Sequence, residues 1–315
     1  MALFNHTYEF YLPQEIKDDF HKNVRAIGNF IDSDSERFIQ LCQIVASQFL
    51  PAHYRVLHDQ IRNNNGFIVI RNLPLDTQLP QTPANGLRPQ GKTSVSEAVL
   101  LGVVSALGYK PFAYAQEKNG ALVHEIAPIA EKACSISSNG IADFDFHTDC
   151  SHLERKQRPH ILALFCLRDA SQTPTKLTRL GDVLERMNPH EVLELMQNNF
   201  IHTPPETFED KTPISNPVLR RSGDKIEVAV STHNVQPTTK NARLALESFH
   251  QLAHECHLEI QWNPGDMLIF NNLRCLHARG AITGDRWLQR CYGTEMLQSP
   301  RTVDLNNVLC SVPAA

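Results

Sequence analysis

Short apolar or alternating segments, each bounded by turn residues, follow one another through most of the chain after residue 112. They are ALVHEIAP, HILALFCLRD, KIEVAVST, LEIQW, DMLIFNN and RWLQRCYG. Short runs of this kind, rich in β-branched and aromatic residues and ended by Gly, Pro, Asn or Asp, are typical of β-strands. Because most of them follow each other without regularly alternating helices, we expect an antiparallel β structure.

The first third of the chain is patterned mainly for helices. Apolar residues at helical spacing and possible N-cap residues predict two helices between residues 32 and 65, divided at Pro51, and another helix over 94–108. The run GFIVIRNLPL lies between them and predicts one buried strand. Residues 76–93 are rich in Pro, Gly, Asn and Thr, which favours a loop.

These patterns predict a single α+β domain in which helices pack on a β core. Residues 1–110 would form a mainly helical part with one core strand, residues 111–300 the β core, and residues 301–315 a tail. Two helices inserted in the core are expected at about 180–199 and 240–256. With 315 residues, of which 42% are hydrophobic, the chain can bury a core of this size.

Charge and cysteine spacing argue against several classes of protein. The formal net charge of -4 does not favour binding to nucleic acid. No apolar stretch approaches the ~20 residues of a membrane helix, and the acidic start of the chain does not resemble a signal peptide, so we expect a cytoplasmic protein. None of the eight cysteines forms a CxxC pair, which argues for reduced, mostly buried thiols rather than a zinc ribbon or a disulfide framework.

The segment FDFHTDCSH, residues 144–152, contains four side chains that can bind a metal. The alternation of Phe and Asp before His147 predicts the end of a strand. Residues i and i+2 of a strand point to the same side, so His147 and Asp149 would face one way. Cys150 would face away, and His152 would need a turn to rejoin them. We therefore predict a pair of metal ligands rather than a cluster of four.

The best candidate for a third ligand is His277, at the start of a predicted strand. Strands that are far apart in sequence can be neighbours in a barrel. Two imidazoles and one carboxylate leave the opposite side of a metal open, as in non-heme Fe(II) sites that accept a bidentate oxoacid and O2. Zinc is the rival metal, but a zinc hydrolase would also need a general base nearby.

The pair Arg286 and Arg290, in the predicted strand RWLQR, favours iron. Residues i and i+4 of a strand share a face, so both guanidinium groups would project into one space. Guanidinium groups bind carboxylates in a planar, bidentate manner, and buried arginines without anionic partners would be costly. Two inward arginines could therefore receive one carboxylate from a cosubstrate and one from a substrate.

The combination of HxD, a distant NxRxxHAR and RWLxR resembles the Fe(II)/2-oxoglutarate-dependent oxygenases of the taurine dioxygenase superfamily. The similarity is to the clavaminate synthase-like subgroup of free amino acid hydroxylases, which the segment GFIVIRNLPLDTQLPQTP also resembles. The resemblance runs from about residue 60 to 293. It implies a double-stranded β-helix (jelly-roll) core with flanking helices, and Fe(II), 2-oxoglutarate and O2 as cofactor and cosubstrates.

The resemblance also implies roles for individual residues. The iron ligands would be His147, Asp149 and His277; Arg286 and Thr175 would hold the distal carboxylate of 2-oxoglutarate; Arg290, Ser137 and Gln116 would bind the substrate. Thr173 and Thr178 are alternatives to Thr175, and Ser135 and Ser138 are alternatives to Ser137.

Three features depart from the subgroup's pattern. Asp149 stands where the subgroup has a longer Glu, and the segment between His277 and Arg286 is short. Residues 228–234 contain no acid, although this region supplies acids to a guanidinium substrate in the subgroup. We therefore do not expect a substrate with a cationic side chain.

The implied activity is hydroxylation of an unactivated carbon in a small amino acid or amino-acid derivative. Desaturation or cyclisation would need the same three ligands. A zinc-dependent hydrolase and a non-enzymatic, cupin-like metal-binding module are further alternatives.

Overall fold

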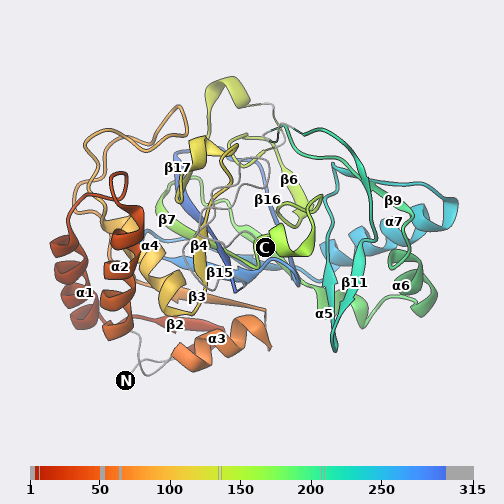
Figure 1. Cartoon of the computed structure of the whole chain (residues 1–315), viewed down its shortest axis with the longest axis horizontal. Coiled ribbons are helices and arrows are strands. Elements are labelled where there is room, and N and C mark those ends of the chain that lie inside the picture. Colours follow the sequence, from red (N-terminus) through yellow and green to blue (C-terminus); the bar gives the residue numbers. More distant parts are fainter. Residues whose placement is uncertain are drawn as a thin grey trace.

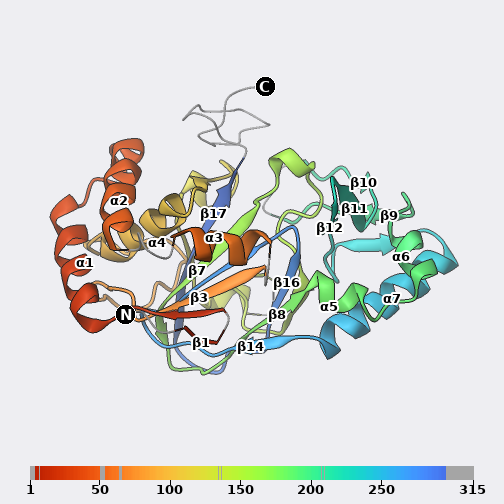
Figure 2. The ribbon, with the colours of Figure 1, turned by 90° about the horizontal axis from the view of Figure 1, so that it is seen from below.

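Two β-sheets lie against each other in the middle of the molecule, with helices at both outer sides (Figure 1). The computed structural model describes residues 4–6, 8–49, 54–63, 66–133, 135, 137–206, 208 and 210–295. The helices at one side are α1 (Gln14–Ile27), α2 (Ser35–Phe49) and α4 (Val95–Ala106), and α3 (Tyr54–Arg62) packs against strands of the larger sheet (Figure 1). Those at the other side are α5 (Leu180–Leu184), α6 (Pro189–Leu195) and α7 (Lys240–Glu255). Figure 2 shows the same separation of the two helical groups from a second direction.

The larger sheet has eight strands, and all of its pairs are antiparallel except β2 with β3. Its order is β1 (Phe4–His6), β2 (Glu9–Tyr11), β3 (Phe67–Arg71), β15 (Met267–Asn271), β7 (Ile161–Asp169), β17 (Arg286–Thr294) and β4 (Lys110–Phe112), and β5 (His124–Ile126) also pairs with β17.

The smaller sheet has four antiparallel strands. Its order is β14 (Leu258–Ile260), β8 (Thr175–Arg179), β16 (Cys275–Arg279) and β6 (Phe144–His147). Two further small sheets consist of β10 (Ile214–Ser215), β9 (Phe200–His202) and β13 (Val235–Pro237), and of β11 (Leu219–Ser222) with β12 (Lys225–Val228).

Strand β7 shows why its sequence is apolar almost without interruption. Leu162 and Leu164 point into the hydrophobic cluster between the two main sheets. Ala163 and Phe165 point to the opposite face, which is covered by α1–α4. Because successive side chains of a strand alternate between faces, a strand covered on both sides needs apolar residues at every position. A third cluster joins α5–α7 to the outer face of the smaller sheet.

The predicted α+β domain and most predicted elements are confirmed. Helix α2 ends at Phe49 and α3 begins at Tyr54, on either side of the predicted division, and the predicted helices 94–108 and 240–256 are α4 and α7. The predicted single helix over 180–199 is wrong, because the chain forms α5 and α6 there. Pro189 has no N–H and suits the first turn of a new helix, and the Asn188 side chain caps that helix by accepting from His190 N.

The N-terminal part contributes more to the sheet than the one predicted strand. The short strands β1 and β2 extend the larger sheet beyond β3. Residues 301–315, the predicted tail, lie outside the described residues, as do Cys134 and Cys310. The six described cysteines are free, and five of them are buried.

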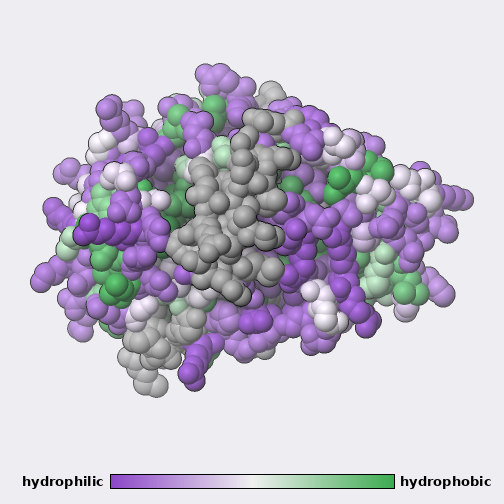
Figure 3. Space-filling model, viewed as in Figure 1, coloured by the Kyte–Doolittle hydropathy of each residue, from purple (hydrophilic) through white to green (hydrophobic). Residues whose placement is uncertain are grey.

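The surface of the described part is mainly polar. Figure 3 shows hydrophilic residues over most of the visible face, with apolar residues scattered between them. Large apolar side chains that are exposed, such as Ile44 and Leu193, belong to different elements. In the part of the chain described here, no helix combines the length and the apolarity that crossing a membrane requires.

Candidate metal centre

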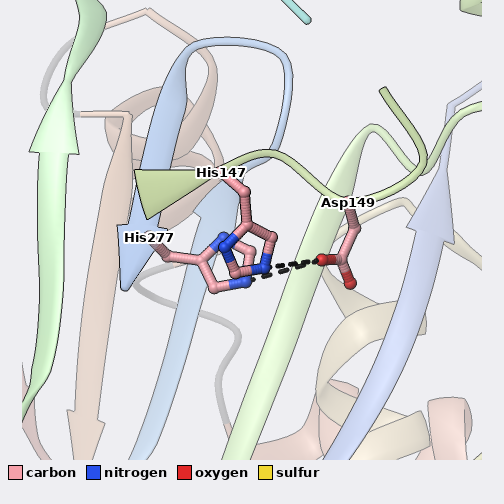
Figure 4. A group of neighbouring side chains, drawn as sticks. All are labelled: His147, Asp149 and His277. Atoms are coloured by element: carbon pink, nitrogen blue, oxygen red, sulfur yellow. Dashed lines mark ion pairs between the residues drawn. The ribbon is translucent and has the colours of Figure 1, made fainter. Parts of the chain in front are cut away.

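His147, Asp149 and His277 converge at one end of the smaller sheet (Figure 4). Strands β6 and β16 are antiparallel neighbours, and their register places His277 directly opposite His147. The Nε2 atoms of His147 and His277 lie 3.3 and 3.6 Å from Oδ1 of Asp149. One ligand atom from each residue lies within 4.8 Å of the others. The structure therefore brings together the three residues that the sequence predicted as ligands.

Asp149 reaches this position from a turn rather than from a strand. Strand β6 ends at His147, and Asp149 follows in the turn. The side chain of Asn272 holds this turn, because its Oδ1 accepts from Asp149 N at 2.8 Å and its Nδ2 donates to Asp149 O at 3.0 Å. His147 and Asp149 do lie together, as predicted. The position of Asp149 is set by the turn that Asn272 holds, not by the alternation of side chains along a strand.

The charges and hydrogen bonds of the three side chains suit a divalent cation. Burial lowers the pKa of His277 to about 3, so its imidazole is neutral at physiological pH. Burial opposes ionisation of Asp149, but the charge of Arg290 and the bond to His147 outweigh it and hold the pKa of that carboxyl well below its usual value. His147 uses Nδ1 for a 2.8 Å hydrogen bond with Asp145 O, which leaves Nε2 for a metal. Two imidazoles and one carboxylate are a donor set that suits Fe(II).

Cys150 and His152 do not belong to the group of ligand atoms among the described residues. Cys150 is buried in the cluster between the sheets. The ring of His152 packs edge-on against Phe208, with 4.6 Å between the ring centroids. Both observations agree with the prediction that these two residues are not ligands.

A cavity beside the three residues is lined by Arg286 and Thr175. Arg286 is 2% exposed, and its Nη2 lies 3.5 Å from Thr175 Oγ1. Within the described residues, Arg286 forms an ion pair with Asp169 alone, at 3.9 Å from Nε. Nε has no hydrogen-bond partner among the same residues. Burying a charged guanidinium with few close acceptors is costly, and binding an anion in the cavity would offset this cost.

The structure distinguishes Thr175 from the two alternative hydroxyl groups. Thr173 donates to the carbonyl oxygen of Ala281, and Thr178 donates to that of Ala253. Thr175 alone of the three lines the cavity.

Arg290 lines the same cavity but is already surrounded by partners. Its Nη1 donates to Asp149 Oδ2 at 2.9 Å, and its Nη2 donates to Glu117 Oε1 at 3.2 Å and to His124 Nδ1 at 2.8 Å. Its guanidinium carbon lies 4.5 Å from the centroid of the Tyr292 ring. Burial and the charge of Arg290 lower the pKa of His124, which keeps this imidazole neutral and able to accept.

Glu117, His124 and Tyr292 were not among the predicted site residues. Tyr292 stands two positions after Arg290 on β17, so alternation could have placed both on one face. Its hydroxyl donates to Asp149 Oδ2 at 3.1 Å. No local pattern marks Glu117 or His124, which approach from β5 and the segment before it.

Ser137 and Gln116 lie near the site, but neither lines the cavity. The Ser137 hydroxyl is 2.7 Å from that of Ser135, and it is the neighbouring Ser138 that lines the cavity. Gln116 directly precedes Glu117, the partner of Arg290. The substrate-binding roles of Ser137 and Gln116 stay predictions.

A larger cavity of about 620 Å³ shares no residue with this site. It is lined by charged side chains such as Arg155 and Glu227, which pair with each other. None of the three clustered residues lines this larger cavity, whereas His147 and His277 line the smaller one. The smaller cavity is therefore the candidate active site.

Comparison with known proteins agrees with this geometry. The model of the family described as "Taurine catabolism dioxygenase TauD, TfdA family" matches residues 43–292. The chain is 29% identical to L-asparagine oxygenase of Streptomyces coelicolor over 76% of this chain and 74% of the relative. It is 25% identical to L-lysine 3-hydroxylase of Catenulispora acidiphila over 73% of this chain and 67% of the relative.

Solved structures share the fold. Asparagine oxygenase in complex with Fe(II), 2S,3S-3-hydroxyasparagine and succinate has a TM-score of 0.85 at 24% identity, covering 98% of this chain and all (100%) of that one. The non-heme iron oxygenase OrfP with Fe and α-ketoglutaric acid has a TM-score of 0.81 at 22% identity, covering 97% and 100%. The match over residues 43–292 and the His-Asp-His donor set together identify the chain as a member of the TauD/TfdA family of non-heme iron, 2-oxoglutarate-dependent oxygenases.

Proposed function

We propose that the protein hydroxylates an unactivated carbon of a free amino acid or amino-acid derivative. The reaction would consume the substrate, 2-oxoglutarate and O2, and release the hydroxylated product, succinate and CO2. The observation that carries this proposal is one cavity lined by both histidines, His147 and His277, and by both arginines, Arg286 and Arg290. We further propose that the two main sheets are the two halves of a double-stranded β-helix, with the metal site at one open end.

His147, Asp149 and His277 would hold Fe(II), which when bound supplies the activation of O2 with 2-oxoglutarate as the reductant. Arg286 and Thr175 would bind the distal carboxylate of 2-oxoglutarate. The support for this role is the burial of Arg286 beside the Thr175 hydroxyl, with its ion pair to Asp169 as long as 3.9 Å.

Arg290 would bind the substrate carboxylate, with Gln116 and Ser137 nearby. The carboxylates around Arg290 support a zwitterionic substrate, because Glu117 can accept from an ammonium group while Arg290 donates to a carboxylate. Asparagine, lysine and arginine derivatives appear in the names of similar proteins. For this protein we favour a substrate with a neutral or polar side chain. The backbone of Ser231 forms an antiparallel β-bridge with His147, so segment 228–234, which contains no acid, lies beside the metal site.

The test has two steps. Anaerobic addition of Fe(II) and 2-oxoglutarate should produce a weak visible charge-transfer band that neither produces alone. Exposure to O2 with a panel of free L-amino acids should then yield succinate and a product that has gained one oxygen atom. Loss of two hydrogen atoms instead would indicate desaturation or cyclisation, and turnover without O2 would indicate a zinc hydrolase.

A pair of variants tests the assignment of the ligands. His147→Ala should abolish both the band and the product. His152→Ala is the matched control, because His152 is a buried histidine close in sequence but outside the ligand group. Turnover that persists in His147→Ala would contradict the metal site.

A further inference from the structure

Arg279 borders the cavity but makes contacts unlike those of Arg286 and Arg290. It stands two residues after His277 on β16, and both line the cavity. The four hydrogen bonds that it donates all go to backbone carbonyl oxygens. Nη1 donates to Ala142 O at 2.8 Å and to Gly280 O at 3.1 Å, and Nη2 donates to Ser137 O at 3.1 Å and to Gly140 O. Arg279 is 8% exposed, and its guanidinium donates these bonds to backbone carbonyl oxygens, so it serves to hold the backbone in place.

Three of these four carbonyls belong to residues 137–142, which we call the cavity loop. The cavity loop leads into β6, which ends at His147, and its Ser138 lines the cavity. Arg279 therefore joins the strand that carries one histidine ligand to the segment that precedes the other.

The cavity loop is also held by a second set of contacts, made by Asn139. The side chain of Asn139 donates to the carbonyl oxygens of Glu125 and Ala127 at 3.2 and 2.8 Å, and it accepts from Lys118 Nζ at 2.7 Å. Gly140 packs so closely that an added Cβ would lie 2.0 Å from Ser135 O. Ser138, between Ser137 and Asn139, thus lies in a segment whose backbone is fixed on both sides.

We propose that Arg279 is a positioning residue that clamps the cavity loop beside the metal site and thereby keeps the substrate oriented for oxidation. This inference rests on the proposed function. Small displacements of a substrate's reacting atoms lower the rate of oxidation steeply. A loosened cavity loop should affect the substrate more than the three metal ligands, Arg286 or the bound 2-oxoglutarate. Loss of the clamp should therefore uncouple the two half-reactions. With a two-electron reductant such as ascorbate in the assay, 2-oxoglutarate, O2 and the reductant would give succinate, CO2, water and oxidised reductant without an equal yield of hydroxylated product.

The variants Arg279→Lys and Arg279→Ala test the clamp. Product formation should fall by on the order of tenfold to a hundredfold, with a raised KM for the amino acid and more succinate formed per product. The affinity for 2-oxoglutarate, read from the charge-transfer band, should be unchanged. Arg71→Ala is the matched control, because Arg71 also holds a carbonyl oxygen, that of Gln261, but pairs with Asp266 away from the cavity. Wild-type KM and succinate-to-product ratio in both Arg279 variants would overturn the inference.

Two further measurements keep the proposal testable if Arg279→Ala does not fold. Gly140→Ala keeps the Arg279 side chain but displaces the loop backbone that it holds, including the Gly140 carbonyl oxygen. It should therefore give the same uncoupling, and full coupling would overturn the clamp. Amide hydrogen exchange in residues 137–142 should be faster in Arg279→Lys than in the wild type, whether or not the enzyme turns over. Unchanged exchange would overturn the clamp alone, whereas a wild type that forms no succinate would overturn the proposed function alone.

Discussion

Arg290 donates a 2.9 Å hydrogen bond to Oδ2 of Asp149, while Oδ1 of the same carboxylate faces the Nε2 atoms of both histidines. One carboxylate thus joins the metal site to the arginine that we assign to the substrate. A charge-assisted bond of this kind fixes the rotamer of Asp149 and keeps it ionised. The metal-binding and substrate-binding functions of the site are therefore expected to depend on each other.

Arg290→Met tests this dependence. Loss of the bond to Asp149 should weaken Fe(II) binding by about 10–100-fold, the usual effect of removing a group that orients a metal ligand, and should also raise KM for the amino acid. Metal affinity is measured by anaerobic titration without 2-oxoglutarate. Arg286→Met is the matched control, since Arg286 lies on the same strand and is also buried, but is not hydrogen-bonded to Asp149. Equal metal affinities in the two variants would show that Arg290 acts on the substrate only.

The contacts of Arg286 and Thr175 predict a graded effect on 2-oxoglutarate. Arg286→Ala removes a buried charge from a carboxylate site and should cost about 2–5 kcal/mol of binding free energy. Thr175→Val removes, at nearly constant volume, a hydroxyl that also accepts from Trp262 Nε1. The lost hydrogen bond to the cosubstrate should cost about 1 kcal/mol, roughly fivefold in Kd. Both are read from the charge-transfer titration. Thr178→Val should leave Kd unchanged, because Thr178 bonds to Ala253 O instead; a larger effect there than at Thr175 would reassign the hydroxyl.

The clustering of the three proposed ligands could be predicted from sequence, but their surroundings could not. Alternation in FDFHTD selected His147 and Asp149, although it could not show that β6 ends at His147 or that Asn272 holds the turn that follows. The neighbours of Arg290 depend on the pairing of β5 with β17, which places His124 opposite Arg290. Such pairing between distant segments leaves no trace in the local pattern.

The same limit applies to the fold. Segments such as β7, with apolar residues on both faces, were predictable because burial dictates their composition. Strands β1 and β2 were not, since each has only three residues, too few for a periodic pattern. The sequence predicts one helix over 180–199 because the apolar spacing continues through Pro189. The proline interrupts the helical hydrogen bonds there, so α5 ends at Leu184 and a second helix, α6, begins at Pro189.

Glu125 predicts a pH-dependent stability. It lies on the face of β5 opposite to His124, and its carboxylate accepts from Trp287 and Gln289. Burial and the nearby charge of Glu97 raise its pKa from 4.5 to about 7. The folded state therefore binds more protons than the unfolded state between these values, and this contribution to stability is present below pH 4.5 and lost as pH rises through about 7.

Glu125→Gln should remove this dependence. The free energy of unfolding of the wild type, measured in urea, should fall with pH over this range by up to about 3 kcal/mol more than that of the variant. Glu131→Gln, at an exposed position, is the control and should keep the wild-type slope. Parallel pH profiles for the wild type and Glu125→Gln would mean that the pKa of Glu125 is the same in the folded and unfolded states.

The close packing of α2 on α4 predicts opposite effects for two glycine-to-alanine changes in helices. A Cβ at Gly102 in α4 would lie 2.6 Å from the carbonyl oxygen of Cys42 and 3.1 Å from Cβ of Ala46, both in α2, whereas a Cβ at Gly181 in α5 would meet nothing within 4 Å. Alanine is favoured over glycine in a helix by up to about 1 kcal/mol, so Gly181→Ala should stabilise the protein. Gly102→Ala must push the two helices apart and should lower the free energy of unfolding by about 1–3 kcal/mol despite the same gain in helix propensity. Urea denaturation followed by circular dichroism measures both, and a Gly102→Ala variant as stable as Gly181→Ala would show that the two helices can separate at little cost.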